Sequence, residues 1–432
     1  MVFWLLCLLV FGAFAGAITP DPVNGRWVDT WAAMPQLTEK ELNLPPAPFT
    51  LFANTTLRQT LRVTTRSKII RVRFSNAFGT LDLPITSASI ALPLNGSFGA
   101  SAIDTDSVQR LTFSGNASIV IPNGALAVSD PIALAYEVEA GTALSVDVYL
   151  REGQQSDDIT SHPGSRTTTW FAEGDAVGVA DIQGLGQGAG VTSIEHWYFL
   201  SAVEAWSSRE TKAFVIIGDS ITDGRGSTTN ENDRWPDQLL NRILANPSLA
   251  TSNLAIINQA AGGNRILMDG LGPNVFGRVE RDVLAHSGVK YAMIFEGVND
   301  IGEATAANAS LVADLVIQAY KQVAVRIHTF GIPFFGATIT PIFGSIYSTA
   351  EHEAARVKVN EWIRTRGKEE GVFDAVIDFD EVARDPGDEE RLNPAFDSGD
   401  GLHLNPEGYS ALAGAVDLGL FEEFEDGVGG FQ

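Results

Sequence analysis

Cysteine is almost lacking from this chain, because Cys7 is the only one among 432 residues. It lies in the apolar stretch 1–17, which has the features of a segment removed on export. The mature chain therefore has no thiol, which excludes cysteine catalysis, a thiolate metal site and a disulfide framework. Stability then depends on the hydrophobic core, and 45% hydrophobic residues suffice to build one in a chain of this length.

Positive charge is also scarce: 29 Lys and Arg residues stand against 53 Asp and Glu residues, a net charge of −24 at pH 7. An acidic surface repels polyphosphates and anionic membranes, so we expect no nucleic-acid partner and no stable membrane association. After residue 17 the sequence has no run that is long and apolar enough to span a bilayer.

Residues 1–17, MVFWLLCLLVFGAFAGA, are free of charged side chains and end in small residues. The run is short for a membrane span, and its end is typical of a signal-peptidase site. We predict a secretory signal peptide and an extracellular protein, with an uncleaved anchor as the alternative. Four Asn-x-Ser/Thr triplets would be glycosylated on that route, at Asn54, Asn95, Asn116 and Asn308.

The pattern of the mature chain changes near residue 210. Before it, short β-branched runs alternate with polar residues and turn signals, which is typical of an antiparallel β-sandwich. The runs are 56–63, 68–74, 87–92, 118–121 and 143–150. We therefore predict a signal peptide at 1–17, a β-rich, sandwich-like domain at 18–208 and a second domain at 209–432.

Beyond residue 210, apolar runs of strand length alternate with stretches of helical period. We expect strands at 213–217, 255–257, 291–295, 333–339 and 375–379, and helices at 235–244, 278–285, 311–330, 351–367 and 406–415. This alternation indicates an α/β fold, in which βαβ units build a parallel sheet covered on both faces. In such sheets the functional residues collect in loops at the carboxyl ends of the strands.

Two loops of this half carry the residues of a nucleophilic site. Ser220 follows the first expected strand, where a strand-to-helix turn can expose its hydroxyl. Asp400 and His403 are three residues apart before the last helix, so the carboxylate can orient the imidazole. We predict Ser220 as nucleophile and His403 as its base, which must be neutral to act and titrates near about 6.5 when free.

Two further loops offer hydrogen-bond donors. Gly262 and Gly263 follow the second expected strand, where the lack of a side chain lets a backbone N–H approach a ligand. Asn299 follows the third strand and has a side-chain amide. With the N–H of Ser220, these donors would stabilise the oxyanion of an acyl-transfer intermediate, and we favour Gly263 over Gly262.

The four segments GDSIT, AGGN, GVND and DGLH resemble, in order and spacing, the conserved blocks of the GDSL or SGNH-hydrolase superfamily. The resemblance covers about residues 214–415. It implies a flavodoxin-like, three-layer α/β/α hydrolase domain that acts on esters with neither a metal nor an organic cofactor. By position it implies the same roles for Ser220, Asn299 and His403, with Asp400 as partner of the histidine. Asp397 is a rival for that place, and the first block has Ile-Thr where the family name has Leu.

Two segments of the first half, Arg26–Ala33 and Ile70–Asn76, are similar to a branch of secreted SGNH esterases that have a β-rich region before the hydrolase domain. Some members of that branch are associated with plant polysaccharide breakdown. We therefore expect a secreted serine carboxylic-ester hydrolase that deacetylates carbohydrate. The alternatives are a GDSL-type lipase, a broad arylesterase or thioesterase, and a carbohydrate-binding protein on a hydrolase scaffold. The sequence leaves the oligomeric state open.

Three other groups of residues are interpreted as structural. The remaining histidines lack metal-ligand spacing: His162, His196, His286, His328 and His352. The acidic segment 378–390 lacks the EF-hand pattern and is expected to be a solvated face. Five tryptophans of the first half are expected to fill its core, with a sugar-stacking platform as the alternative: Trp27, Trp31, Trp170, Trp197 and Trp206.

Overall fold

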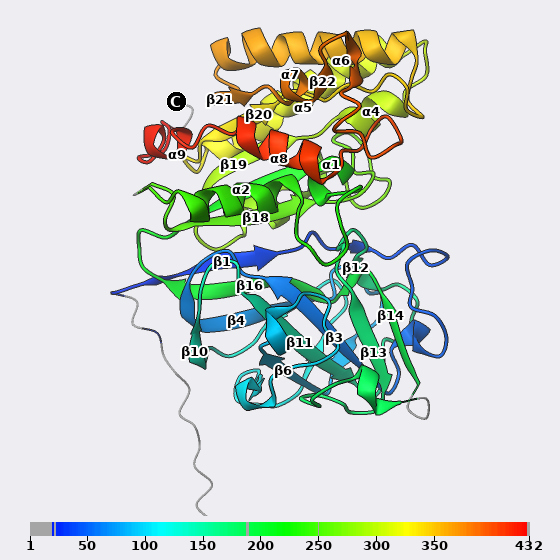
Figure 1. Ribbon diagram of the computed structural model, residues 1–432, viewed down its shortest axis with the longest axis vertical. Helices are drawn as coiled ribbons and strands as arrows, with labels where there is room; N and C mark the ends of the chain where they lie inside the picture. Colours follow the sequence, from blue (N-terminus) through cyan, green and yellow to red (C-terminus); the bar gives the residue numbers. More distant parts are fainter. Residues whose placement is uncertain (1–19, 21–22, 187–189, 249, 430–432) are drawn as a thin grey trace, which may run out of the picture.

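Two regions of different secondary structure make up the molecule, with antiparallel strands in the lower part of Figure 1 and alternating strands and helices in the upper part. The computed structural model describes residues 20, 23–186, 190–248 and 250–429. The predicted signal peptide at 1–17 lies outside these residues. Among the described residues, no helix is long and apolar enough to cross a membrane.

The upper region is built on five parallel strands in the order β18-β17-β19-β20-β21. They are rich in Ile, Val, Phe and Ala, as expected of strands covered on both faces. This strand order is that of flavodoxin-like, doubly wound sheets, so the predicted α/β fold class is confirmed. The strands are β17 (Lys212–Gly218), β18 (Leu254–Ala260), β19 (Val289–Phe295), β20 (Phe334–Ala337) and β21 (Ala375–Ile377).

Helices flank this sheet in two groups. One group pairs α2 (Trp235–Ala245) with α8 (Pro406–Ala415). In the other, α5 (Ala309–His328) contacts both α3 (Val275–Val279) and α6 (Ala350–Trp362). The shorter elements are α1 (Ser220–Asp223), η5 (Glu280–Leu284), α4 (Val298–Gly302), η6 (Ile363–Gly367), α7 (Phe379–Ala383), β22 (Arg384–Asp385), β23 (Asp388–Leu392) and α9 (Leu420–Glu423).

Local capping explains where two predicted elements were wrong in their bounds. The helix expected at 278–285 begins earlier, because the Asn274 side chain caps α3. It then continues as the π-helical turn η5. The strand expected at 375–379 ends at Ile377, because the side chain of Asp378 caps α7. The predicted bounds came from the spacing of apolar residues alone, whereas a side-chain cap can start a helix at another residue.

The lower region contains two main antiparallel sheets whose inner faces share one core. Val72 and Val203 of the first sheet pack in the same cluster as Leu57 and Val146 of the second. The first sheet comprises β1 (Arg26–Ala32), β16 (Leu200–Ser207), β4 (Ser67–Ser75), β10 (Ile132–Val138) and β9 (Leu126–Val128). The second comprises β14 (Val191–Ile194), β13 (Thr169–Glu173), β3 (Thr55–Arg62), β11 (Ala143–Leu150), β6 (Ser87–Ala91) and β7 (Gln109–Arg110).

Smaller elements complete the lower region. A three-stranded sheet, β2 (Gln36–Leu37), β12 (Thr160–His162) and β15 (Trp197–Tyr198), lies at its junction with the upper region. The pair β5 (Leu83–Ile85) and β8 (Ile119–Ile121) is separate. Short 3₁₀ turns are η1 (Phe49–Leu51), η2 (Leu94–Gly96), η3 (Thr105–Ser107) and η4 (Gln183–Leu185).

The tryptophans of the lower region lie in separate places. Trp31 and Trp197 are buried and form an edge-to-face pair with centroids 4.9 Å apart. Trp27 and Trp206 form a second pair, half-buried, which the Arg71 guanidinium covers at 4.2 Å. These contacts favour packing over a shared sugar-stacking platform.

The two regions pack tightly on each other. Val28 and Ala32 of β1 belong to the hydrophobic cluster of the upper region. The N–H of Asp29 donates to the carbonyl of Ser287 at 2.9 Å, and the Asp29 carboxylate accepts from His286 at 2.7 Å. Apolar and polar contacts therefore join the β-rich region to the parallel sheet along the length of β1.

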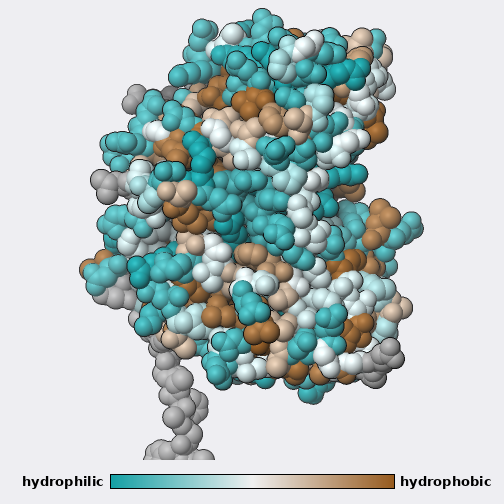
Figure 2. Space-filling model, in the orientation of Figure 1, coloured by the Kyte–Doolittle hydropathy of each residue, from teal (hydrophilic) through white to brown (hydrophobic). Residues whose placement is uncertain are grey.

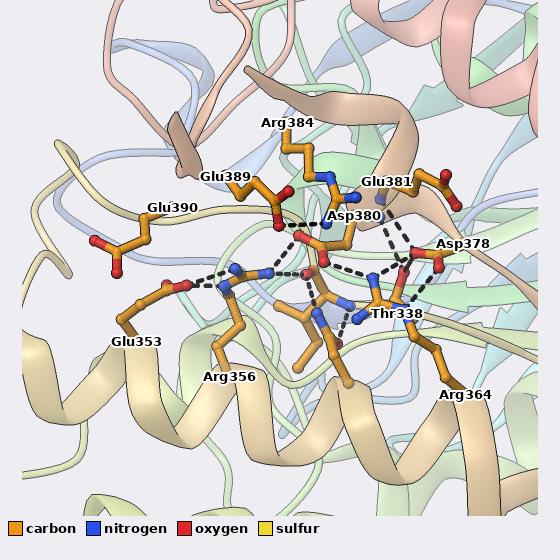
Figure 3. Close-up of polar contacts among 12 residues, drawn as sticks. Thr338, Glu353, Arg356, Arg364, Asp378, Asp380, Glu381, Arg384, Glu389 and Glu390 are labelled. Atoms are coloured by element: carbon orange, nitrogen blue, oxygen red, sulfur yellow. Dashed lines mark hydrogen bonds and ion pairs between the residues drawn. The ribbon is translucent and has the colours of Figure 1, made fainter. Parts of the chain in front are cut away.

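The acidic segment 378–390 is a solvated face only in part, because Asp380 is buried and Asp378 is half-buried. Asp380 is only 4% exposed and lies 2.5 Å from Arg356 and 2.6 Å from Arg364. Asp378 forms a second ion pair with Arg364, as Figure 3 shows. Glu381, Asp388, Glu389 and Glu390 are exposed, as predicted. The arginines come from α6 and η6, far away in sequence, so the charge pairing was invisible in the local composition.

Candidate active site

Ser220 stands at the carboxyl end of the central strand β17. Asp219 accepts a hydrogen bond from the N–H of Ile221 at 2.9 Å and so caps the short helix α1. Gly218 has no room for a side chain, because a Cβ there would lie 2.5 Å from the Thr222 side chain. The tight turn places Ser220 at the first position of α1 with 6% of its surface exposed.

A continuous chain of hydrogen bonds links Ser220, His403 and Asp400. The Nδ1 of His403 lies 2.6 Å from Asp400 Oδ2, and its Nε2 lies 2.7 Å from Ser220 Oγ. Asp400 also accepts from the backbone N–H of His403 at 2.8 Å, which fixes the carboxylate. With Nδ1–H directed at the carboxylate, Nε2 is free to accept the serine proton.

Asp397 has a different place in the same loop. Its carboxylate accepts from the backbone N–H groups of Gly399 at 2.8 Å and Gly401 at 3.1 Å. It therefore shapes the turn that presents Asp400, and it makes no hydrogen bond with His403 in the described part of the chain.

The pKa of His403 reflects competing effects. Burial lowers the pKa of the imidazole, the Asp400 carboxylate acts to raise it, and the positive charges of Arg225 and Arg166 lower it further. The net direction is downward. Partial burial acts to raise the pKa of Asp400, but hydrogen bonds from His403 and Leu402 hold it below its usual range. His403 is thus kept neutral, and Asp400 ionised, over a wide range of pH.

Asn299 lies at the start of α4, beyond the end of β19. One N–H of its side chain donates to the carbonyl of Asn264 at 2.8 Å, and Tyr347 OH donates to its Oδ1 at 3.0 Å. These two contacts fix the orientation of the amide. Because Nδ2 carries two hydrogens, one donor remains for a ligand.

The glycine pair lies in the loop after β18. Gly263 has φ +68°, and a Cβ there would lie 2.6 Å from Leu271. A Cβ on Gly262 would meet only Asp223, at 3.8 Å. Among the described residues, neither glycine N–H has a hydrogen-bond partner. Backbone conformation and space both require glycine at 263, while the choice of the donor between the two remains a prediction.

Three buried carboxyl groups lie around the ends of β17 and β19, and the sequence analysis did not identify them. Asp300 accepts from the N–H groups of Ile266 and Leu267 and so anchors the loop after β18. Burial raises the pKa of Asp300 to about 6 and that of Asp219 to about 7. It raises the pKa of Glu296 well above the usual range as well. The signal was the position of Asp219 and Asp300 next to Ser220 and Asn299 in two of the four segments, with Glu296 just before the second.

A loop of the β-rich region also reaches this site, and no sequence signal predicted it. His162 Nε2 lies 2.9 Å from Asp223 Oδ1, three residues after Ser220. Thr168 N–H donates to Asn230 Oδ1 at 2.8 Å. In Figure 1, β12 accordingly lies below α1, at the same end of the sheet as α4. The site is therefore built from both regions.

The structure also describes the surroundings of the glycosylation candidates and of the histidines that the sequence analysis interpreted as structural. The four glycosylation candidates Asn54, Asn95, Asn116 and Asn308 are exposed. The histidines expected to be structural all form hydrogen bonds or ion pairs: His162, His196, His286, His328 and His352. In the described ranges no group of three or more His, Cys, Asp or Glu side chains is arranged to hold a metal ion.

Comparisons with known proteins point to the same half of the chain. Residues 216–411 match the model of the GDSL-like Lipase/Acylhydrolase family. A comparison with curated proteins finds no match.

Solved structures similar to this half include a GDSL-like lipase from Bacteroides thetaiotaomicron, with 16% identity over 49% of this chain and 88% of its own, at a TM-score of 0.36. An acetyl xylan esterase has 21% identity over 47% of this chain and 96% of its own, at a TM-score of 0.37. An alpha/beta hydrolase from the metagenome of Lake Arreo, Spain, has 19% identity over 47% of this chain and 92% of its own, at a TM-score of 0.33.

Proposed function

Because residues 216–411 are a domain of the GDSL-like Lipase/Acylhydrolase family, we propose that this chain is a carboxylic-ester hydrolase with Ser220 as its nucleophile. The observation that carries the proposal is the 2.7 Å contact between Ser220 Oγ and His403 Nε2, continued to Asp400 at 2.6 Å. Nucleophile, base and orienting carboxylate are already within hydrogen-bonding distance.

The first half of the reaction acylates the serine. His403 Nε2 takes the proton of Ser220 Oγ as the oxygen attacks the ester carbonyl carbon. The negative charge that develops on the carbonyl oxygen is held by the N–H groups of Ser220 and Gly263 and by the Asn299 amide. Collapse of this intermediate breaks the bond to the alcohol, which takes the proton from His403 and leaves.

The second half releases the acid. A water molecule gives a proton to His403 Nε2 and attacks the acyl carbon on Ser220. The same donors hold the second oxyanion. Collapse frees the carboxylic acid, and the proton returns to Ser220 Oγ. Throughout, Asp400 keeps the imidazole in one tautomer and stabilises its charged form.

We propose short acyl groups, acetyl above all, carried on carbohydrate such as plant cell-wall polysaccharide. Leu271 lies against Gly263, and Tyr347 is bonded to Asn299, so bulky side chains stand beside two of the oxyanion donors. This crowding favours a small acyl group. The similarity of the first half to polysaccharide-associated esterases supports carbohydrate as the alcohol.

A specific observation favours a second candidate, a GDSL-type lipase or a broad arylesterase. Met268 and Leu271, on the loop after β18, and Ile346, next to Tyr347, are exposed apolar side chains. Ile346 is 87% exposed. Apolar side chains on loops that flank a catalytic centre are suited to a longer acyl chain or an aromatic ring.

We propose secretion and glycosylation as the cellular setting. The apolar N-terminal run supports the first, and the exposure of all four sequon asparagines supports the second. The face shown in Figure 2 is mainly hydrophilic, with scattered hydrophobic groups, which favours a protein without stable membrane association.

The first experiment measures acetate released from acetylated xylan and acetylated pectin, with p-nitrophenyl acetate alongside. Ser220→Ala should abolish release, whereas Ser252→Ala, an exposed serine in the turn before β18, should not change it. Turnover of p-nitrophenyl acetate alone would support the mechanism and favour a lipid or another small ester as the natural substrate. Tight binding of polysaccharide without turnover of any ester would instead favour the binding protein.

A further inference from the structure

Two arginines beside the catalytic residues lack an acidic partner. The chain has 53 acidic and 29 Lys and Arg residues, so an unpaired cation stands out. Within the described residues, the guanidinium groups of Arg166 and Arg225 form neither an ion pair nor a hydrogen bond. By contrast, Arg234, in the same connection between α1 and α2, pairs with Asp237 at 3.6 Å.

Arg166 comes from the β-rich region and is held firmly in place. It has φ +50°, an uncommon conformation for a residue with a side chain. Its carbonyl accepts from the N–H of Asn230 at 2.9 Å, and Asn230 also bonds to Thr168 through its side chain. The Nε of Arg166 is buried without a partner. A strained backbone that presents an unsatisfied cation is characteristic of a functional position.

Arg225 comes from the hydrolase region, just beyond α1. Its N–H donates to the carbonyl of Ser220 at 2.9 Å, and its own carbonyl accepts from Tyr409 OH at 2.5 Å. The backbone is therefore fixed with respect to the nucleophile, while the side chain is exposed.

Both arginines are anchored to the connection that follows Ser220, Arg225 through the Ser220 carbonyl and Arg166 through the N–H of Asn230. Both arginines lower the pKa of His403, so their fields reach the imidazole. The Asp400 carboxylate is occupied by His403 and Leu402. The overall charge of −24 acts at long range and is screened beyond about 10 Å at ordinary ionic strength. A ligand that reaches Arg166 and Arg225 therefore meets guanidinium donors that no described side chain occupies.

We propose that Arg166 and Arg225 form a subsite for a carboxylate on the alcohol part of the ester, so that the preferred substrate is an acetylated uronic-acid polymer. This inference rests on the proposed esterase function and narrows its substrate. The planar guanidinium group presents parallel donors that match a carboxylate, which a neutral sugar cannot satisfy. Because one arginine belongs to each region, the β-rich region takes part in substrate selection.

The test compares two polymers that differ only in charge: acetylated polygalacturonate and its methyl-esterified form, with acetate release as the readout. We expect kcat/KM to be about tenfold higher for the charged polymer, mainly through KM, as for a hydrogen bond to a charged group. Raising the salt concentration should erase the difference. The double variant R166Q/R225Q should lose the preference, and R225Q alone should lose part of it.

Arg151→Gln is the matched control, an exposed arginine of the β-rich region whose side chain has no partner among the described residues. It should keep the full preference. Equal rates on the two polymers, a preference that survives in both R225Q and the double variant, or turnover of p-nitrophenyl acetate without turnover of either polymer would overturn the subsite alone. No turnover of any of these esters by the unmodified enzyme would overturn the proposed function and the subsite with it.

Discussion

His162 Nε2 lies 2.9 Å from Asp223 Oδ1, and this buried contact joins the β-rich region to the segment that carries Ser220. The other ring nitrogen of His162 lies 3.1 Å from the carbonyl of Met34. The second oxygen of Asp223 is buried without a partner. The segment that carries Ser220 is therefore in contact with a histidine that lies 58 residues before Ser220 in the sequence and in the other region.

Replacing His162 should harm both stability and activity. His162→Ala leaves the Asp223 carboxylate buried and unpaired, which costs about 3 kcal/mol or more in the free energy of unfolding. Because Asp223 ends α1, kcat should fall as well. The measurements are urea unfolding and turnover of p-nitrophenyl acetate. His328→Ala is the control, since its partner Asp374 is partly exposed and distant from Ser220. Equal effects of the two variants on kcat would contradict this role.

Activity should depend on the neutral form of His403 and persist to mildly acidic pH. Burial lowers the pKa of His403, so the acid limb of kcat/KM should lie below about 6.5, the value of a free imidazole. R166Q/R225Q should shift the limb upward, because two nearby positive charges are removed. Profiles on p-nitrophenyl acetate between about pH 3 and pH 9 provide the measurement, because this range extends on both sides of about 6.5, the pKa of free histidine. A profile flat down to the lowest pH would rule out His403 as base.

Asn299 should act on the transition state and hardly on binding. Asn299→Ala removes one oxyanion donor and should lower kcat by roughly 10²–10³, with KM little changed. Tyr347→Phe should have a smaller effect of the same kind, because it only releases the hydrogen bond that orients the amide. Steady-state kinetics on p-nitrophenyl acetate separate kcat from KM. A loss in Asn299→Ala confined to KM would argue against an oxyanion role.

The buried carboxyl groups should make the protein less stable as the pH rises. Glu296 is 1% exposed, both of its oxygens lack partners, and its pKa is raised by burial and then by Asp219. A carboxyl whose pKa is raised in the folded state stabilises that state below its unfolded pKa, near about 4.3. This contribution is lost as the pH rises through the folded pKa, which is about 7 for Asp219.

Glu296→Gln should therefore flatten the fall in Tm as the pH rises above about 4.3, the usual pKa of a Glu carboxyl, because the variant has no group to ionise at this position. Thermal unfolding at several pH values measures it. Glu361→Gln, on the exposed face of α6, is the control and should leave the slope unchanged. If the Tm of Glu296→Gln falls with pH as steeply as that of the unmodified protein, the Glu296 carboxyl is ionised in the folded state.

Local sequence was sufficient to predict most of the residues that the fold brings together at the candidate site. The period of the apolar residues indicated the alternation of strands and helices, and parallel strands bring their carboxyl ends to one edge. Ser220 and Asn299 follow two neighbouring strands, β17 and β19. Asp400 and His403 are close in sequence, so one turn sufficed to bring them together.

The acidic segment shows why composition alone misled. Asp380 looks like one of several solvated acids in the sequence, yet it is buried between Arg356 and Arg364. Those arginines lie on a helix that precedes the segment and packs beside it only in the folded chain. A charge pattern reports neighbours along the chain, whereas burial depends on neighbours in space.

The sequence by itself determined the α/β class, the four segments of the candidate site and the β-rich first half, because each rests on residues within one turn, one strand or one hydrophobic period. Only the tertiary structure decided that His162 contacts Asp223 and that the Arg166 carbonyl accepts from the N–H of Asn230, in the connection that follows Ser220. These contacts join residues about 60 apart or more along the chain, across two regions with separate cores. No local pattern encodes them, since they arise from how the two packed regions meet.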